Sequence, residues 1–524
     1  EALKMAGTIF DRLNRQAGSS LDSDEASTPF EIPDVIWNDR STWKSDARQK
    51  RKGNDHVDSP SVRVMQYDSY RNMFAPCQPA LQKVQSLFFE YCKEQAGFDL
   101  LRDFVLIKFQ LEAAGDAFHR PQSYVVDTCI EDVLRRGIRA NGSVFHVVGS
   151  SKSALQSRSL FFYRCSATRS RLDSQRLLER FIPDLDALTA KKGVAKRVKY
   201  AGLLFTGCQH VLELPKDEKT EVDHSLRDDQ FTDGCGVISW LLAEHLRKQA
   251  GLDEMPSVWQ IRYYGHGFIC KGVLVVDGSK EMRAKYFIGF RKSLLKVPTR
   301  RPMERRMLTH STDPSRSVSE FLQRRIGVVS WSKRNVGKLN KQTVALLSAN
   351  MPEEELLEIQ ADQLRSVQNS ATHPLAAAEC CATHGERPFF DAFQRLPRVR
   401  AIQEHPPSEY TQVLRAASQL VCASEKLQVQ LPASRLLLGA SLPEHLHEFL
   451  QEGECVVMTD TGPYTGLVLV SRSPSYSPGD LRILRAVQPR VGNPVLELRN
   501  CILFCTSGAR ADPDKMSGGD LDGE

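Results

Sequence analysis

Apolar residues along this chain form short runs in some regions and recur at helical spacing in others. Short apolar runs bounded by turn residues predict strands. They fall at 104–109, 144–148, 160–163 and 271–277. Apolar residues three and four positions apart predict helices over 124–136 and 238–249, with Gly137 and Gly251 as their ends. The first two thirds of the chain therefore combine strands and helices.

In the last third of the chain, the pattern first becomes helical and then predicts strands again. A helix is predicted over 352–368, because Pro352 suits a first helical turn and the acids after it suit the positive helix end. Helical and loop character continues to about 425. Further apolar runs predict strands at 436–438, 467–470, 481–487 and 501–504. The pattern is a β-rich module, a helical connector and a second β-rich module.

We expect five segments on this basis. They are a flexible or weakly ordered lead-in at 1–60, a mixed α/β part at 61–140, a first β-barrel module with inserted helices at 141–345, a helical connector at 346–425, and a second, incomplete barrel at 426–524. A chain of 524 residues exceeds what one core usually organises, which agrees with several domains.

Composition sets few further limits. Hydrophobic residues make up 41% and charged residues 26%, as in ordinary soluble proteins. No apolar stretch approaches the length of a membrane-spanning helix, so no membrane partner is expected. The 13 cysteines include no Cys-x-x-Cys pair, which argues against a zinc ribbon. This usage suits a reducing compartment, and we expect the cytoplasm, the nucleus or both.

The net charge of +6 is mild, but the basic residues are clustered. Basic patches attract polyanions, although each cluster taken alone is more often a solvated face. The clusters are Lys191, Lys192, Lys196, Arg197 and Lys199; Arg300, Arg301, Arg305 and Arg306; and Arg324, Arg325, Lys333 and Arg334.

The last five residues carry the most chemistry. Asp520, Asp522 and Glu524 alternate with Leu521 and Gly523. Alternate residues of an extended segment share one side, and glycine lets such a segment bend until the acids converge. Converging carboxylates repel each other, so one takes up a proton unless a cation neutralises them, and hard oxygen ligands suit Mg²⁺. A solvated turn is the plain alternative; an EF-hand fails in both possible registers.

Several motifs occur elsewhere in the chain. A Phe-x-Asp-Gly-x-Gly-x-Ile-Ser block begins at Phe231, an Arg-x-Ser-x-x-Lys block begins at Arg291, and an Arg-x-Pro block at Arg472 precedes the Pro-Gly-Asp at 478–480. Together with 149–155, 256–262, 271–272 and the terminal acids, they resemble, in order, the eukaryotic cellular RNA-dependent RNA polymerases of RNA silencing. One such motif is weak evidence, whereas a series in family order makes coincidence improbable.

This resemblance implies an α+β protein with two double-psi β-barrels, the second one truncated, joined by a helical connector. It implies RNA-directed RNA polymerase activity that copies single-stranded RNA into double-stranded RNA for silencing and siRNA production. The implied partners are a single-stranded RNA template, NTPs and silencing-pathway proteins. Asp520, Asp522 and Glu524 would be catalytic and would hold Mg²⁺, while the substrate- or RNA-binding residues would be Arg262, Lys271, Arg291 and Lys296.

The chain departs from the family at its end, because the family loop closes with Asp where Glu524 stands. One extra methylene moves the carboxylate by roughly 1.5 Å, and a misplacement of that order can cost about 100-fold in rate. Since the chain starts with Glu and stops inside a motif, we expect it to be a piece of a longer protein. The alternative function is a catalytically impaired or truncated RNA-binding paralogue.

Overall fold

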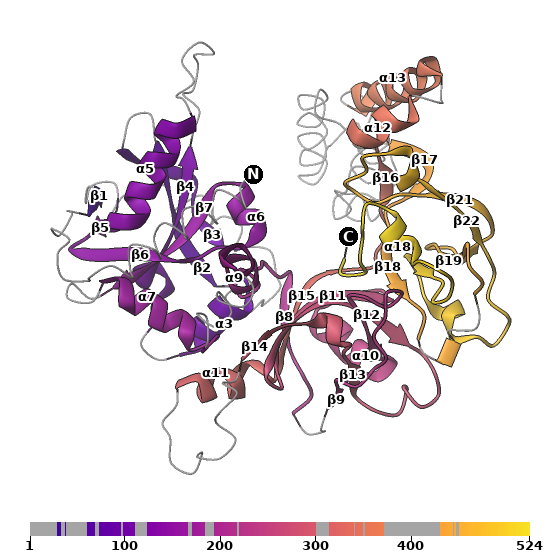
Figure 1. Ribbon diagram of the computed structural model, residues 1–524, viewed down its shortest axis with the longest axis horizontal. Helices are drawn as coiled ribbons and strands as arrows, with labels where there is room; N and C mark the ends of the chain where they lie inside the picture. The colour runs from indigo at the N-terminus through magenta and orange to yellow at the C-terminus, as the bar shows by residue number, and fades with distance from the viewer. Residues whose placement is uncertain are drawn as a thin grey trace, which may run out of the picture.

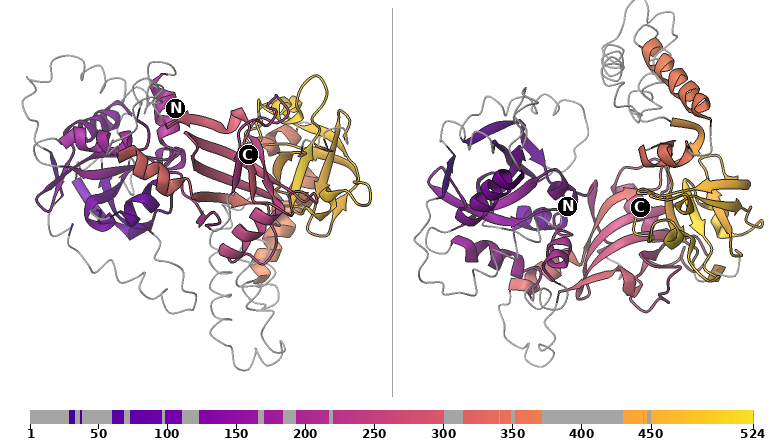
Figure 2. Two further views of the ribbon diagram at one scale, coloured as in Figure 1. Left: turned by 90° about the horizontal axis from the view of Figure 1, so that it is seen from below. Right: turned by 45° about the horizontal axis from the view of Figure 1, so that its top comes forward.

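The computed structural model describes residues 29–32, 37, 60–68, 73–95, 98–110, 123–165, 170–183, 193–216, 220–299, 314–339, 341–348, 352–370, 430–443, 445–446 and 450–523. Its three large sheets lie in a row, with the eight-stranded sheet in the middle (Figures 1 and 2). Most of 1–60, the basic residues at 300–306 and the connector residues 371–425 lie outside the described part.

The N-terminal module is a seven-stranded mixed sheet with helices on both faces. Its strand order is β1 (Phe30–Ile32), β5 (Ile138–Ala140), β6 (Ser143–Gly149), β7 (Ser159–Cys165), β4 (Phe104–Gln110), β2 (Ser61–Asp68) and β3 (Met73–Lys83). Its helices are α3 (Leu87–Glu94), α4 (Leu100–Asp103), α5 (Ser123–Arg136), α6 (Lys152–Gln156), α7 (Ser170–Glu179) and α9 (Val194–Ala201).

This sheet crosses two of the segment limits expected from the sequence. Within the lead-in, β1 pairs with β5, and Trp37 is 3% exposed and packs in the core. The expected limit between 140 and 141 falls between β5 and β6, which pair with each other in this sheet. The division into domains remains a prediction.

The central module is an eight-stranded mixed sheet. Its order is β8 (His210–Glu213), β15 (Arg325–Trp331), β11 (Val258–Gly265), β12 (Phe268–Asp277), β10 (Cys235–Ser239), β13 (Phe287–Gly289) and β9 (Glu221–Asp223), with β14 (Leu295–Pro298) paired to β12. Its helices are α10 (Trp240–Gln249), the 3₁₀ helix η2 (Lys292–Leu294) and α11 (Pro314–Leu322). Ser239 caps α10 by accepting from Leu242 N, so the helix starts two residues after the predicted position.

A short two-stranded sheet, β16 (Val336–Lys338) and β17 (Gln430–Arg435), lies beside α12 (Lys341–Leu347) and α13 (Glu353–Ser370) (Figure 1). The C-terminal module has the strand order β18 (Leu438–Ser441), β23 (Cys501–Phe504), β19 (Glu454–Met458), β22 (Arg482–Ala486) and β21 (Gly466–Val470), with β20 (Pro463–Tyr464) paired to β19. Three short helices complete it: η6 (Pro478–Asp480), η7 (Pro494–Glu497) and α18 (Asp512–Lys515).

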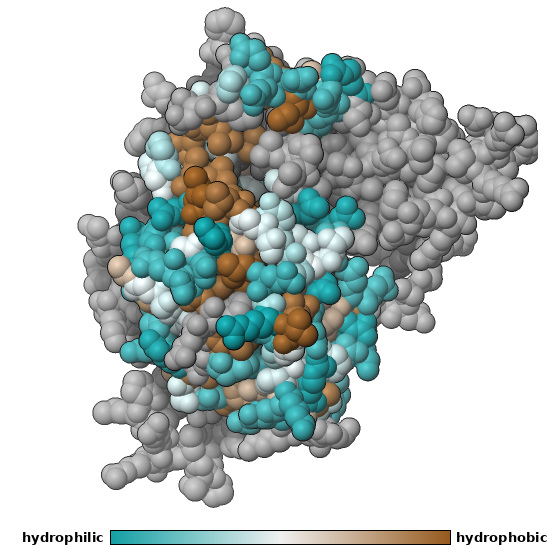
Figure 3. Space-filling view, turned by 90° about the vertical axis from the view of Figure 1, so that its right-hand side faces the viewer, coloured by the Kyte–Doolittle hydropathy of each residue, from teal (hydrophilic) through white to brown (hydrophobic). Residues whose placement is uncertain are grey.

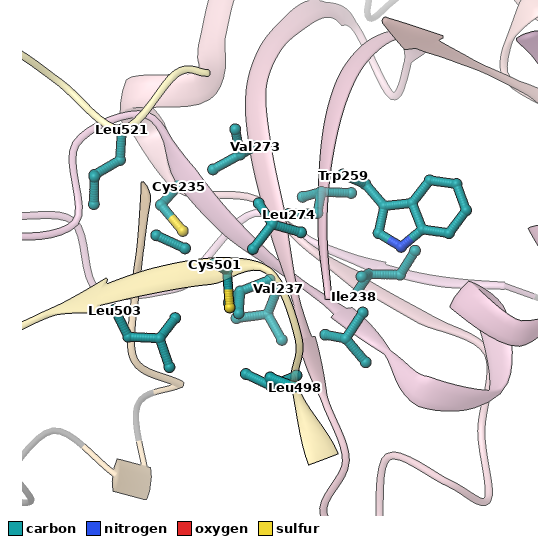
Figure 4. Packing of buried hydrophobic residues seen from close by; sticks show 14 of the residues in the cluster. Cys235, Val237, Ile238, Trp259, Val273, Leu274, Leu498, Cys501, Leu503 and Leu521 are labelled. Carbon is teal, nitrogen blue, oxygen red and sulfur yellow. The ribbon is translucent and has the colours of Figure 1, made fainter. Parts of the chain in front are cut away.

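The central and C-terminal sheets share one hydrophobic core. Buried side chains of β10, β11 and β12 pack in the same cluster as those of β19 and β23. Figure 4 shows the junction, where Cys235 and Val237 lie next to Cys501 and Leu503. Removing apolar surface from water drives this packing, so the two sheets hold each other in place.

The outer side of the C-terminal sheet is partly apolar. Figure 3 faces this side of the molecule, and brown apolar residues gather on it. Leu467 and Leu469 on β21 are 69% and 56% exposed, and Ile483 on β22 is 68% exposed. Leu469 and Ile483 are direct cross-strand partners, so these residues form one surface.

The predicted class, α+β, agrees with these mixed sheets and helices, while the two double-psi β-barrels remain a prediction. Among the helices of the described residues, none is both long and apolar enough to cross a membrane.

Candidate active site

The acidic loop follows β23 and α18, and its first turn is held by two side chains of the same module. Ser517 and Gly518 have positive φ values of 54° and 66°. Asp480 accepts a hydrogen bond from Ser517 N at 2.9 Å. Arg472 donates to the carbonyls of Met516 and Ser517 at 3.4 and 3.5 Å. The turn is therefore fixed from both sides before the acids begin.

The tip of the loop is held by the central sheet. Leu521, between the two aspartates, is 4% exposed and points into the shared core (Figure 4). Its amide donates to the carbonyl of Asp233 at 2.8 Å. Gln260 Nε2, from β11, donates to the carbonyls of Asp522 and Gly523 at 3.1 and 3.5 Å. The loop is thus a contact between two modules.

Two glycines make this close approach possible. Gly523 has φ +109°, and a Cβ there would overlap the Gln260 side chain. Gly234 has φ +82°, and a Cβ there would lie 3.0 Å from Asp522 N. Both backbone shapes favour glycine, and a Cβ would clash outright at Gly523 and be tightly crowded at Gly234.

The segment around Gly234 is itself braced by the block that begins at Arg291. Ser293 Oγ accepts from Gly234 N at 3.1 Å. Arg291 donates to the carbonyl of Arg227 at 2.7 Å and to that of Cys235. Arg291 is fully buried, so its guanidinium acts here as an internal tie between backbone segments.

Positive charge converges on Asp522. Lys271 Nζ, from β12, forms an ion pair with Asp522 Oδ2, and the two side chains are 20% and 9% exposed. Burial opposes ionisation of Asp522, but the charges of Lys271, Lys296 and Arg262 outweigh it and hold the pKa of this carboxyl below its usual value. Asp522 is therefore a carboxylate at neutral pH.

Arg262 is the most buried of the three cations. It is 6% exposed, and its Nη1 donates to the carbonyl of Ile261 at 2.7 Å. Its Nε has no hydrogen-bond partner within the described residues. Burial lowers the pKa of Arg262, and the negative charge of Asp522 opposes this shift. A buried guanidinium with an unused donor beside a carboxylate contributes positive potential to the site.

Asp233 lies in the same electrostatic environment. Partial burial raises the pKa of Asp233, Lys296 opposes the rise, and the charges of Asp228, Asp522 and Asp514 add to it. The site thus holds negative and positive groups close together. Groups with shifted pKa values of this kind are often found at functional sites.

The structure brings together four of the residues expected from the sequence: Asp522, Lys271, Lys296 and Arg262. Asp520 lies on the same loop and is partly exposed. Glu524 lies outside the described residues, so its place is a prediction. Arg291, which the motif predicts to bind substrate, is buried here and bonds two backbone carbonyls, and its contact with substrate stays a prediction.

Gln260 is a site residue that the sequence reasoning missed. It lies within the motif block at 256–262, but its residue type alone implies no role. The available signal was spacing: Gln260 and Arg262 are two apart on β11, so they face the same side of the sheet. What the sequence does not show is that Asp522 lies opposite that side.

The donor set can be compared with what a divalent cation requires. Within the described part of the chain, no three or more His, Cys, Asp or Glu side chains gather into a ready metal site. Asp520 and Asp522 nevertheless supply hard oxygen donors on one loop, and a cationic ammonium already lies against Asp522. The chemistry of these two donors suits a hard divalent ion, although the described residues alone do not complete a site for one.

Comparison with known proteins gives concordant matches. The family model described as "RNA dependent RNA polymerase" matches residues 98–524, more than half of the chain. "Probable RNA-dependent RNA polymerase 1" of Oryza sativa subsp. japonica is 27% identical over 403 residues, which cover 75% of this chain and 49% of the rice protein. "RNA-dependent RNA polymerase 1" of Arabidopsis thaliana is 26% identical over 412 residues, covering 75% and 33%.

A fungal relative and a solved structure agree. "RNA-dependent RNA polymerase 1" of Schizosaccharomyces pombe is 25% identical over 448 residues, covering 80% of this chain and 33% of the yeast protein. "RNA dependent RNA polymerase QDE-1 from Thielavia terrestris" matches with a TM-score of 0.56 at 15% identity, covering 99% of this chain and 60% of that chain. The structural likeness shows a shared fold. The chain spans about half the length of the rice relative and a third of the other two.

Proposed function

This chain belongs to the RNA-dependent RNA polymerase family, as its motifs predicted, and we propose that it carries the nucleotidyl-transfer site of a polymerase that copies single-stranded RNA into double-stranded RNA. The observation that supports this most is the acidic loop, which a second module holds against Lys271, Lys296 and Arg262. Carboxylates facing a group of cations suit a reaction between a metal-bound hydroxyl and a polyphosphate.

In the proposed reaction, the 3′-hydroxyl of the growing RNA attacks the α-phosphate of an NTP. A new P–O bond forms, the hydroxyl proton passes to solvent water, the bond from the α-phosphate to its bridging oxygen breaks, and pyrophosphate leaves. Asp520 and Asp522, with Glu524 as a proposed third ligand, would hold Mg²⁺, which when bound supplies the charge that lowers the hydroxyl pKa and stabilises the leaving group.

The chain's own residues supply position and charge. Lys271 and Lys296 stabilise the developing negative charge on the phosphates, and the buried Arg262 adds to the local potential. The acidic loop is held in place by Gln260, Leu521 and Gly234. Its acids are therefore already positioned before the reaction begins. Arg291 acts one step further away, through the backbone that Gly234 belongs to.

We further propose that the two modules around the loop are the double-psi β-barrels implied by the motifs. A role in RNA silencing with its protein partners, and a place in the cytoplasm or nucleus, are part of the same proposal. Within the described residues, eight cysteines are both free and buried, which supports a reducing compartment.

The test is incorporation of labelled NTPs on single-stranded RNA by the full-length protein with Mg²⁺. Asp522→Asn should lower incorporation by at least about 100-fold, because it removes a charged ligand, while RNA affinity stays within about twofold. Asp132→Asn is the matched control, since Asp132 pairs with Arg135 on the surface of α5. If wild-type protein binds RNA but incorporates nothing, the RNA-binding paralogue is the better description.

A further inference from the structure

The ion pair between Lys271 and Asp522 has a consequence for metal binding. The ammonium of Lys271 lies against Oδ2 of a carboxylate that the proposed function assigns to a divalent cation. Asp522 is almost fully buried, and an unpaired charge in such a place is costly. Without a metal, Lys271 satisfies that charge.

An ammonium and a divalent cation cannot both occupy the place beside Asp522 Oδ2, and their like charges repel each other across one carboxylate. We propose that Lys271 is a built-in counter-ion that holds Asp522 until a divalent cation displaces it, and that the freed ammonium then binds the triphosphate of the incoming nucleotide. The inference rests on the proposed function and adds an order of binding to it. The metal binds first, and its binding frees Lys271 to contact the phosphates.

Lys271 is suited to this exchange because only its side chain has to move. Its backbone lies within β12, directly opposite Arg262 on β11. The loop on the other side is fixed by Gln260 and by the buried Leu521. A lysine has four methylenes between the chain and its charge, so its ammonium can swing away while both backbones stay in place.

The other two cations near Asp522 do not share this role. Lys296 influences the carboxyl through its charge, and Arg262 is largely buried with Nη1 bonded to Ile261 O. Within the described residues, Lys271 is the one that donates a hydrogen bond to the Asp522 side chain. Removing Lys271 should therefore free a metal-binding oxygen, whereas removing Lys296 should only reduce background repulsion.

Linkage makes the proposal measurable without catalysis. If Lys271 competes with the metal, removing Lys271 must raise the affinity for the metal. The expected increase is about 5- to 100-fold, the usual range of coupling between two ligands. A residue that helped to bind the metal, or merely supported the fold, would change affinity in the opposite direction or not at all.

The experiment is a titration of the full-length protein with Mn²⁺, followed by electron paramagnetic resonance, with no RNA or nucleotide present. Lys271→Met should bind Mn²⁺ about 10-fold more tightly than wild type. The matched control, Lys296→Met, removes the same charge but, among the described residues, no hydrogen bond to the Asp522 side chain, and it should change affinity by about twofold or less. Equal or weaker Mn²⁺ binding by Lys271→Met would overturn the proposal.

Asp522→Asn separates this inference from the proposed function. If Asp522→Asn binds Mn²⁺ as wild type does, the loop is not the metal site and the proposed function fails. If Asp522→Asn loses the Mn²⁺ and Lys271→Met gains no affinity, the function stands and the exchange is wrong. Should Lys271→Met not fold, Lys271→Gln removes the charge but keeps a polar side chain, and the same tighter binding is expected of it.

Discussion

At the scale of single residues, Gln260 has a larger role than its chemistry suggests. One neutral amide on the central sheet holds the two carbonyls at the tip of the acidic loop. Each hydrogen bond contributes only about 0.5–1.5 kcal/mol to stability, but the geometry of the acids depends on both. Activity should therefore be more sensitive than stability to a change at this position.

We predict that Gln260→Ala lowers nucleotide incorporation by about 10- to 100-fold, because the loop tip is no longer fixed, while the melting temperature falls by only a few degrees. The matched control is Gln249→Ala on α10, which removes a similar bond to the carbonyl of Glu213 away from the site. Equal effects of the two variants on incorporation would contradict a positioning role for Gln260.

For Arg291, in contrast to Gln260, we expect a larger effect on stability than on RNA binding. We predict that Arg291→Lys destabilises the protein by about 2–4 kcal/mol, because a lysine cannot bond both carbonyls that the guanidinium spans. The salt dependence of RNA binding should not change, since a buried arginine releases no phosphate counter-ion. Thermal unfolding and RNA binding at several salt concentrations check the two parts.

Arg510→Lys serves as the control for Arg291→Lys, because Arg510 forms an exposed ion pair with Asp514. This substitution should change the free energy of unfolding by less than about 0.5 kcal/mol. A drop of about one in the slope of log affinity against log salt for Arg291→Lys would show a phosphate contact instead. The motif located Arg291 near the site, but type and spacing alone do not distinguish an inward from an outward guanidinium.

At the scale of elements, the acidic loop depends on Asp480 of η6. Hydrogen bonds from the amide of Tyr476, from the side chain and amide of Ser517, and from the amide of Ser477 hold the pKa of Asp480 well below its ordinary value. A lowered carboxyl pKa means that folding favours the charged form. The stabilisation is complete above the ordinary pKa of about 4 and is lost as the pH falls further toward the folded-state pKa.

We therefore predict that wild type is more stable than Asp480→Asn at pH 7 and that this difference shrinks below about pH 4. Unfolding in denaturant at pH 7, 4 and 3 measures it. Asp132→Asn, in an exposed helical pair, should show little difference at any of these pH values. A difference between wild type and Asp480→Asn that is the same at all three pH values would show that its charge is not involved.

Element prediction succeeded where apolar pattern and boundary chemistry agree. The strand predicted at 501–504 is β23 as observed, and the helix predicted over 124–136 begins one residue earlier as α5. The strand predicted at 436–438 was misplaced, because the chain instead forms β17 up to Arg435 and β18 from Leu438. Local pattern gives the existence of an element, whereas its pairing partner depends on segments far away in the chain.

At the scale of the whole molecule, the site exists because two sheets share a core. The acids come from the C-terminal module, and Gln260, Lys271 and the backbone around Gly234 come from the central one. The order of these motif blocks and the chemistry of their side chains can be predicted from the sequence. It did not predict that Leu521 would join them by packing between the sheets, since burial of one leucine depends on everything around it.

The shared core predicts that the two modules lose stability together. Leu503 on β23 is fully buried in the common cluster, so Leu503→Ala should cost about 2–5 kcal/mol. Amide hydrogen exchange should then speed up in β10 and β12 as well as in β19 and β23. Phe162→Ala, buried in a cluster confined to the N-terminal module, should instead affect β4 and β6. If Leu503→Ala leaves the amides of β10 and β12 unchanged, the sheets are independent and the acidic loop is not fixed by their packing.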